Sequence, residues 1–349
     1  MNNTQTKKIK IGNITIGGGS KIAIQSMLNA PAENIEENVR QAVMLEKAGC
    51  EIVRVAVPNI ESVVLVEKIK DKIKIPLVAD IHFDYKLAIE CANAGVDKIR
   101  INPGNIGDED RIKAVADICK LKGIPIRIGV NSGSVEKHIL AKYQKPTPEA
   151  LVESALYHSA LLEKFDFNDI VISIKSSNVK TMIDAYRLIS EKCCYPLHLG
   201  VTEAGTERMG LIKSSIGIGS LLADNIGDTI RVSLTASPEK EIYAAKDILK
   251  SLGMLENGAV IVSCPTCGRT KINLIKLAEQ VEEALKACDK PITVAVMGCA
   301  VNGPGEAKEA DIGIAGGDGC ALLFKKGEII KKVDEKDVLN VLLEEIDLL

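Results

Sequence analysis

The segment PLVADIHFDYKLAIECANAGVDKIRIN, residues 76–102, contains one complete example of the unit that recurs through most of the chain. Two β-rich runs, Leu77–Ala79 and Lys98–Ile101, flank a stretch with helical character. Gly95 is a typical helix-ending residue, and the second run begins soon after it. The segment therefore predicts a strand, a helix and a second strand joined by short connections.

Similar β-rich runs recur on both sides of this segment. The eight expected strands are Ile22–Gln25, Ile52–Val57, Leu77–Ala79, Lys98–Ile101, Ile126–Val130, Ile170–Ile174, Leu197–Val201 and Thr229–Leu234. A β hairpin over Lys8–Gly19 is expected before them, and the last helix is expected over Glu239–Lys250. Eight alternating strand and helix units predict a (β/α)8 barrel of the TIM type. A doubly wound sheet of eight strands is the alternative.

Polar residues cluster where these strands end. In such barrels the ligand-binding groups lie at the carboxyl ends of the strands. The residues expected there are Arg54, Asp80, His82, Arg100, Asn102, Arg127, Asn131, Lys175, His198, Glu203, Arg231 and Ser233. A single Arg in such a place is usually part of a structural ion pair. Five cations from five strands would repel each other unless an anion lay between them, and Arg suits phosphate oxygens, so a phosphorylated substrate is expected.

Glu203 follows the seventh expected strand. Bound phosphates would offset the cations around it, so Glu203 is a candidate donor of a proton to a leaving hydroxyl. It could equally serve as the structural partner of Arg231 or Lys175.

The C-terminal part contains a second chemical signal. Cys264-Pro-Thr-Cys267 and Cys299 each follow a short apolar run, and Glu306 comes after a turn-forming segment. Three thiolates and one carboxylate suit an iron–sulfur cluster with one exchangeable iron. A CxxC pair alone would fit a structural zinc site or a redox-active dithiol equally well. The third cysteine at a strand end favours the cluster.

Composition limits the classes of partner. The 349-residue chain has a net charge of −3, only 3% aromatic residues and no Trp, which argues against a nucleic-acid-binding protein. The first residues, MNNTQTKKIK, lack the apolar run of an export signal, and no later run is long enough to span a bilayer. With ten cysteines and no export signal, a cytoplasmic location with reduced thiols is expected.

The motifs together resemble the family of 4-hydroxy-3-methylbut-2-enyl diphosphate synthases of the non-mevalonate isoprenoid pathway, in their shorter two-domain bacterial form. The matching segments are AIQSM at Ala23, VRVAVP at Val53, PLVADIHFDY at Pro76, KIRINPGNIG at Lys98, PIRIGVNSGS at Pro125, ISIKSSN at Ile172, PLHLGVTEAG at Pro196, GDTIRVSLT at Gly227, CPTCGRT at Cys264 and VAVMGCAVNGPGEA at Val294. Their order along nearly the whole chain makes the resemblance highly specific.

The resemblance implies a substrate-binding barrel over residues 1–250 and a small α+β iron–sulfur domain over residues 251–349. It implies a 4Fe–4S cluster held by Cys264, Cys267, Cys299 and Glu306. The implied reaction is reductive ring opening and dehydration of 2-C-methyl-D-erythritol 2,4-cyclodiphosphate by two electrons, supplied by ferredoxin or flavodoxin. Glu203 and Glu306 would be the catalytic residues.

The connection between the two domains predicts a homodimer. The last barrel helix should carry the chain about 18 Å away from the mouth. The connector from Ser251 to Ala259 can span at most about 30 Å. A cluster domain therefore reaches the mouth of a partner chain more easily than its own, and the family resemblance points the same way.

Another class of protein also fits the residues. A redox-silent barrel, such as a phosphosugar isomerase or aldolase, could carry a structural zinc completed by Cys320 or Cys288. A binding module without turnover is a further alternative. Iron and sulfide, or zinc, in the purified protein would separate these classes.

Overall fold

The computed structural model describes residues 5–255, 257–286, 288, 290–300 and 307–349. The chain divides into two compact units, Met1–Met254 and Leu255–Leu349, each described here by itself. No helix of the described residues is both long enough and apolar enough to cross a membrane.

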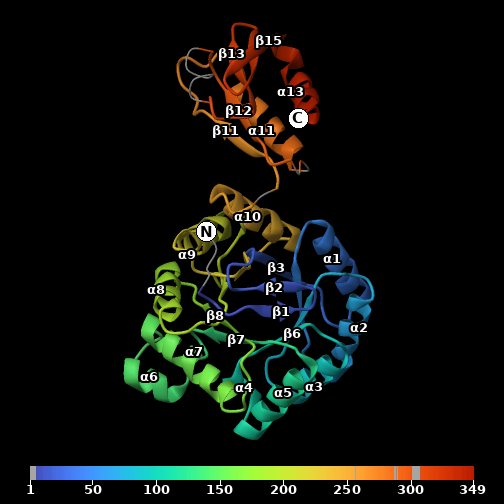
Figure 1. Cartoon of the computed structure of the whole chain (residues 1–349), viewed down its shortest axis with the longest axis vertical. Coiled ribbons are helices and arrows are strands. Elements are labelled where there is room, and N and C mark those ends of the chain that lie inside the picture. Colours follow the sequence, from blue (N-terminus) through green and yellow to red (C-terminus); the bar gives the residue numbers. More distant parts are fainter. Residues whose placement is uncertain (1–4, 256, 287, 289, 301–306) are drawn as a thin grey trace. The chain divides into compact units, whose positions relative to one another are not determined.

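The first unit is a (β/α)8 barrel, as predicted (Figure 1). Its strands are β3 (Ala23–Met27), β4 (Ile52–Ala56), β5 (Leu77–Asp80), β6 (Lys98–Ile101), β7 (Ile126–Asn131), β8 (Ile170–Lys175), β9 (His198–Leu199) and β10 (Thr229–Ile230). They are hydrogen-bonded in the order β8-β7-β6-β5-β4-β3-β10-β9. A parallel bridge between Ile172 and Leu197 joins the two ends of this sheet. The doubly wound alternative is wrong, because an open sheet would leave these ends apart.

Helices cover the outside of the ring in Figure 1. They are α1 (Ile35–Lys47), η1 (Ile60–Val63), α2 (Val64–Lys70), α3 (Tyr85–Asn93), α4 (Pro103–Ile106), α5 (Glu109–Lys122), α6 (Lys137–Tyr143), α7 (Pro148–Glu163), α8 (Val179–Ser190), α9 (Glu207–Ala223) and α10 (Pro238–Ser251). Gly95 and Gly123 follow α3 and α5 with φ of 89° and 65°. Glycine adopts this left-handed conformation without steric cost, so both helices end where the sequence predicts.

A hairpin closes the amino end of the barrel. β1 (Ile9–Ile11) and β2 (Ile14–Ile16) pair in antiparallel register. Ile9, Ile11 and Ile16 pack against the first inward-facing residues of the strands, which are Ala23, Ile52, Val78 and Val171. Burying each isoleucine stabilises the fold by about 1.5–3 kcal/mol. The carboxyl end of the barrel is thus left for ligand binding.

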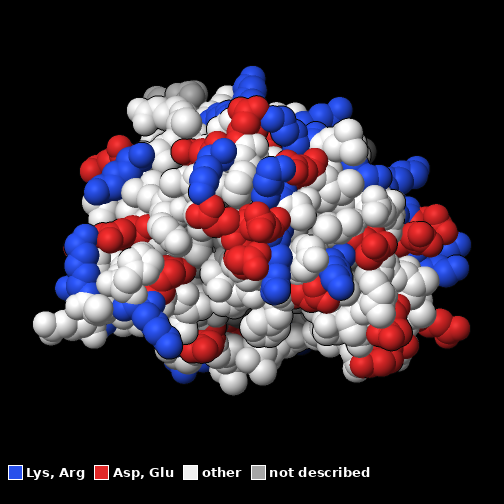
Figure 2. Space-filling model, turned by 90° about the horizontal axis from the view of Figure 1, so that it is seen from below, with Lys and Arg blue, Asp and Glu red and all other residues white. Residues whose placement is uncertain are grey.

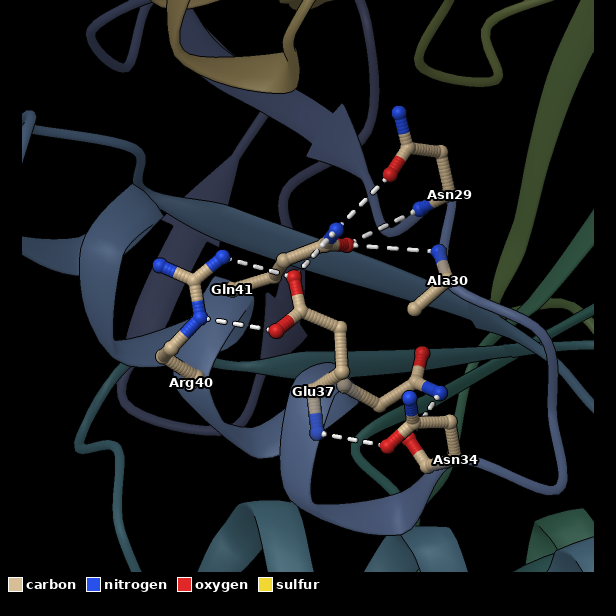
Figure 3. A network of polar contacts seen from close by, with 7 residues as sticks. Asn29, Ala30, Asn34, Glu37, Arg40 and Gln41 are labelled. Atoms are coloured by element: carbon tan, nitrogen blue, oxygen red, sulfur yellow. Dashed lines mark hydrogen bonds and ion pairs between the residues drawn. The ribbon is translucent and has the colours of Figure 1, made fainter.

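The loop after β3 is attached to α1 (Figure 3). Gln41 accepts hydrogen bonds from the N–H groups of Asn29 and Ala30, at 3.1 and 3.4 Å. Its amide also donates to Asn29 Oδ1 at 2.8 Å. On the exposed side of the helix, Arg40 donates twice to Glu37, at 2.7 Å each. These bonds fix the loop that borders the mouth at β3.

The second unit is a small α+β domain, also as predicted. Its strands are β11 (Val260–Ser263), β12 (Thr293–Met297), β13 (Ile312–Gly317), β14 (Cys320–Lys325) and β15 (Glu328–Asp334). The first three are parallel and the last two antiparallel to their neighbours. The helices are α11 (Leu274–Leu285), η2 (Glu335–Asp337) and α13 (Val338–Asp347). Val281, Leu342 and Ile346 pack with Val294 and Ile312 in its core.

Candidate active site

A cavity of about 380 Å³ opens at the carboxyl end of the barrel. Its lining is dominated by the polar residues that follow the strands. The lining residues are Arg54, His82, Phe83, Arg100, Asn102, Asn105, Arg127, Gly129, Asn131, Ser134, Ser173, Lys175, Thr202 and Arg231. The structure therefore brings together most of the residues that the sequence places at the mouth.

Asp80 is the central carboxylate of this mouth. Its oxygens accept hydrogen bonds from Arg54 Nη2 at 2.5 Å and from Arg100 Nη1 at 3.1 Å. His82 Nε2 lies 3.2 Å from the same carboxylate. Burial alone would raise the pKa of Asp80. Its pKa nevertheless lies well below the usual value, because Arg54, His82 and Arg100 favour the charged form. Asp80 is therefore an anion that holds two guanidinium groups side by side.

The other mouth cations differ in compensation: Arg231 has a carboxylate partner, whereas two nitrogens of Arg127 have no partner among the described residues. Arg231 donates to the Glu241 carboxylate, with both contacts at 3.2 Å, so the structure pairs Arg231 with Glu241 and not with Glu203. Arg127 is 1% exposed, and its Nε and Nη1 have no hydrogen-bond partner among the described residues. Burial, followed by the nearby Arg231, lowers the pKa of Lys175 well below its usual value. The mouth thus carries more cationic groups than carboxylates, as an anion-binding site does.

The outer surface is different. Figure 2 shows one outer face of the molecule, on which Lys and Arg side chains lie among Asp and Glu. Opposite charges there offset each other over short distances. The accumulation of one sign of charge is therefore a property of the barrel mouth and not of this face.

His198 and Ser233 do not line the cavity. His198 is fully buried, and its Nδ1 lies 2.8 Å from Thr229 Oγ1. Burial, followed by the charge of Arg127, lowers the pKa of His198 well below its usual value, so its ring is neutral. Ser233 lies two residues beyond Arg231 and is partly exposed.

Glu203 is exposed at the rim, directly after the lining residue Thr202. Its φ is 51°, a left-handed conformation that is uncommon for residues other than glycine. Backbone strain of this kind is often concentrated at functional sites. The turn places Glu203 next in sequence to a residue of the cavity wall.

Six lining residues are not in the set expected at the mouth. Asn105 and Ser134 belong to the loops that begin at the expected residues Asn102 and Asn131, and the other four are Phe83, Gly129, Ser173 and Thr202. Ser173 had a usable signal, because it lies two residues before Lys175 on β8 and side chains alternate along a strand. Gly129 makes room for a cation: an added Cβ would lie 2.5 Å from Arg100 Nε. Phe83 is 73% exposed, and no pattern in the sequence distinguishes it.

Cys264, Cys267 and Cys299, the cysteines of the predicted cluster, lie in the second unit. Cys264 directly follows β11, and Cys299 follows β12 after one intervening residue. β11 and β12 are parallel neighbours, so both cysteines lie at the same edge of the sheet. The N–H of Gly298 donates to Cys264 Sγ at 3.2 Å, which places Cys264 beside the segment that carries Cys299.

These residues fit a thiolate-bound metal group in their chemistry. Hydrogen bonds from Arg269, its backbone N–H first, lower the pKa of the exposed Cys267 and favour the thiolate that iron–sulfur clusters require. Among the described residues, no three His, Cys, Asp or Glu side chains are gathered as a metal site would need. Glu306, the fourth expected ligand, lies outside the described residues.

Comparisons with known proteins cover nearly the whole chain. Residues 6–246 match the family model described as the GcpE TIM-barrel domain, and residues 260–348 match the GcpE protein C-terminal domain. A protein of Clostridium perfringens is 59% identical over 347 residues, 99% of each chain. A protein of Bacillus cereus is 51% identical over 346 residues, 99% of this chain and 94% of that one. Both are named 4-hydroxy-3-methylbut-2-en-1-yl diphosphate synthase (flavodoxin).

Solved structures that resemble the model share only the fold. Type I 3-dehydroquinate dehydratase of Clostridium difficile is 18% identical, with a TM-score of 0.53 over 71% of this chain and 98% of that one. Dihydropteroate synthase of Yersinia pestis is 14% identical, with a TM-score of 0.51 over 70% of this chain and 98% of that one. At such identities the similarity supports the barrel architecture and no particular activity.

Replacing Asp80 by Asn should destabilise the protein. The substitution leaves the buried Arg54 and Arg100 without their carboxylate, and breaking a buried ion pair costs about 3–5 kcal/mol. Urea unfolding at neutral pH measures this loss. The matched control is Asp117→Asn, which breaks an exposed pair with Lys113 and should cost about 0–1 kcal/mol.

The pH dependence gives a second check on Asp80. The pKa of Asp80 is lower in the folded protein than in the unfolded protein, where it is about 3.9. The charged Asp80 therefore contributes fully to the free energy of unfolding above about pH 3.9, and this contribution is lost as the pH falls through the pKa of the folded protein. The difference between wild type and Asp80→Asn should therefore shrink in acid. Equal stability of the two proteins at neutral pH would contradict the assigned role of Asp80.

Proposed function

The chain belongs to the GcpE family, whose curated members named above are 4-hydroxy-3-methylbut-2-en-1-yl diphosphate synthases, and we propose that it catalyses the same conversion. The substrate is 2-C-methyl-D-erythritol 2,4-cyclodiphosphate. The reaction opens its ring at a carbon–oxygen bond and removes a hydroxyl as water, which consumes two electrons and protons. The observation that carries the proposal is the family match along both units, together with the cation-rich mouth that the substrate's phosphates require.

The barrel mouth holds the diphosphate in this proposal. Arg54, Arg127 and Lys175 contact phosphate oxygens, for which guanidinium and ammonium groups are suited. Arg100, Asn102, Asn131 and Arg231, which also line the cavity, complete the proposed substrate-binding set. His198 and Ser233, which were expected in this set, do not line the cavity, so no direct contact with the substrate is proposed for them. The cations also stabilise the negative charge that develops on the departing phosphate oxygen as the ring opens.

Glu203 is the proposed proton donor. It stands at the rim, in a strained turn directly after Thr202. In this proposal the carboxyl of Glu203 gives its proton to the departing hydroxyl, which leaves as water.

The proposed cofactor is a 4Fe–4S cluster held by Cys264, Cys267, Cys299 and Glu306. The family is one of iron–sulfur oxidoreductases, and the thiols of the second unit fit that chemistry. When bound, the cluster supplies electrons and an iron that can accept an oxygen ligand. The carboxylate of Glu306 is the weakest donor of the four, so it is the ligand that yields its place most readily.

The proposed partners follow from the family. The relatives' name specifies flavodoxin, which we propose as the electron donor in preference to ferredoxin. The cytoplasm is the proposed location, because none of the ten cysteines, all of them among the described residues, forms a disulfide. The redox-silent zinc barrel and the binding module are not supported, since the close relatives are named as reductive synthases of this diphosphate.

We further propose that the active site forms between two chains. α10 has 14 residues and carries the chain about 21 Å from the mouth toward the base of the barrel. Residues 252–259 span at most about 28 Å when extended. A connector of this length supports a homodimer in which each cluster domain serves the barrel of the partner.

Replacing Cys264, Cys267 or Cys299 by Ser should abolish the cluster, because each supplies one of only three thiolates. Glu306→Ala should retain much of the iron while turnover collapses, since water can replace a carboxylate ligand. Iron and sulfide analysis with visible spectroscopy of anaerobically purified protein tests both expectations. Full iron and absorbance in any of the Ser variants would remove that cysteine from the ligand set. Zinc without sulfide in the wild type would overturn the cluster itself.

Binding and proton transfer should separate by mutation. A charge-assisted phosphate contact contributes about 1.5–3 kcal/mol, so Arg127→Ala should weaken substrate binding roughly ten- to a hundred-fold. Glu203→Gln should leave binding nearly intact and reduce turnover. Calorimetric titration with the cyclodiphosphate, compared with turnover, measures both effects. An equal loss of binding in the two variants would refute this division of roles.

Complementation tests the shared active site. Cys264→Ser in one chain and the double variant Arg127→Ala, Lys175→Ala in the other should each be inactive alone. Co-expressed heterodimers should regain up to half of the sites, because one pairing joins an intact barrel to an intact cluster. Verified heterodimers without activity would contradict the trans arrangement, since sites formed within one chain are defective in both chains.

A further inference from the structure

Lys98 lies in the barrel interior and has no role in the site described so far. It is the first residue of β6 and is 0% exposed. Side chains alternate along a strand, so Lys98 faces the same side as Arg100, which lines the cavity, while Ile99 faces the helices. Lys98 itself does not reach the cavity wall. It therefore lies one inward-facing position deeper in the barrel than the anion site.

The ammonium position of Lys98 is uncompensated. Its Nζ has no hydrogen-bond partner within the described part of the chain. The charges that act on it most strongly are those of Arg127 and Arg54, both of the same sign. The carboxylate of Asp80 is already occupied by Arg54 and Arg100. Burial and these two cations lower the pKa of Lys98 well below its usual value.

Other buried titratable groups of the barrel, one on a strand and one on α10, do not offset this charge. His198 is neutral, and Glu241 is engaged by Arg231 and by the Ser26 hydroxyl, at 2.8 Å. The titratable groups that face the interior and mouth from the other strands are Arg54, Asp80, Arg127, Lys175, His198 and Arg231. Cations thus outnumber anions around Lys98, and a bound anion is what would change that balance.

We propose that Lys98 is uncharged in the ligand-free enzyme and takes up one proton from solvent when the diphosphate binds at the mouth above it. The inference rests on the proposed function of that mouth. The phosphates cancel the repulsion from Arg127 and Arg54, after which the charged form of Lys98 is stabilised. Lys98 then acts as a positioning residue: it adds positive charge beneath the arginines without touching the substrate. When the product leaves, the proton returns to solvent.

The substrate is well suited to testing this. Each phosphate of the cyclodiphosphate is esterified to the sugar and bridged to the other, so neither titrates near neutral pH. Protons taken up on binding therefore belong to the protein. Without a reductant the oxidised holoenzyme does not complete turnover, so binding can be measured separately.

The experiment is calorimetric titration of anaerobic, full-length holoenzyme with the cyclodiphosphate in buffers of different ionisation enthalpy. The slope of the observed enthalpy against that of the buffer gives the number of protons taken up. Wild type should take up about one proton more than Lys98→Met on binding. As the pH rises, the affinity of wild type for the cyclodiphosphate should fall by up to about tenfold more per pH unit than the affinity of Lys98→Met. Lys175 and His198 remain in the variant, so only this difference is assigned to Lys98.

A control variant and a second measurement on Lys98→Met complete the test. Lys113→Met removes an exposed lysine from the outer helix α5 and should take up as many protons as wild type. Lys98→Met should unfold at a higher temperature than wild type when no ligand is bound, because the methionine avoids burying an amine. This increase in unfolding temperature should be smaller when the cyclodiphosphate is bound.

The outcomes are distinguishable. Equal proton uptake by wild type and Lys98→Met overturns the inference and leaves the proposed function intact. Failure of wild type to bind the cyclodiphosphate overturns the proposed function. If Lys98→Met does not fold, Lys98→Gln replaces it. A wild-type affinity that does not change with pH, or a wild-type binding enthalpy that does not change with the buffer, also rejects the inference.

Discussion

Repulsion between the cations at the barrel mouth is the interaction on which the rest of the structure depends. Arg54 and Arg100 share one carboxylate, Asp80, while Arg127 is buried with two nitrogens unpartnered among the described residues. Such a group is unfavourable by itself, because each charge loses hydration and faces others of the same sign. An anionic ligand removes most of that cost. The site is therefore least stable when empty, a condition that favours binding of an anionic ligand such as the proposed diphosphate.

Apolar packing on either side allows the barrel to hold this charge. The hairpin formed by β1 and β2 fills the amino end with Ile9, Ile11 and Ile16. The outward side chains of the strands pack beneath the helices, and Gln41 fixes the loop beside β3. The free energy gained by hydrophobic burial thus offsets the unfavourable charge repulsion at the mouth. This division matches the general pattern of such barrels, in which one end serves stability and the other serves function.

The sequence predicts most of this because strand ends are readable from local patterns. Alternating runs and helix-ending glycines located all eight strands, and with them Arg54, Arg127 and Lys175 at the mouth. The depth of a residue inside the barrel could not be predicted from the sequence. His198 was expected at the mouth but lies below it, because the height of a residue along the barrel axis depends on the shear between strands. Gly129 was missed for a related reason, since its role is the space it leaves for Arg100 from the neighbouring strand. The ligand role of Glu306 stays a prediction, because that residue lies outside the described residues.

Charge balance explains why such a mouth suits this reaction. Opening the ring converts a bridged phosphate into a terminal one, so the ligand becomes more negative as the reaction proceeds. A site with more cations than carboxylates therefore binds the transition state more tightly than the substrate, which accelerates the reaction. The same excess of charge would also retain the product. A lysine that is charged only while phosphates are bound, as proposed for Lys98, lessens this conflict, because part of the binding free energy is used to protonate it and the product is held less tightly than by a permanent charge. The mouth then returns to a state with one fewer buried charge, in which the empty barrel is less strained.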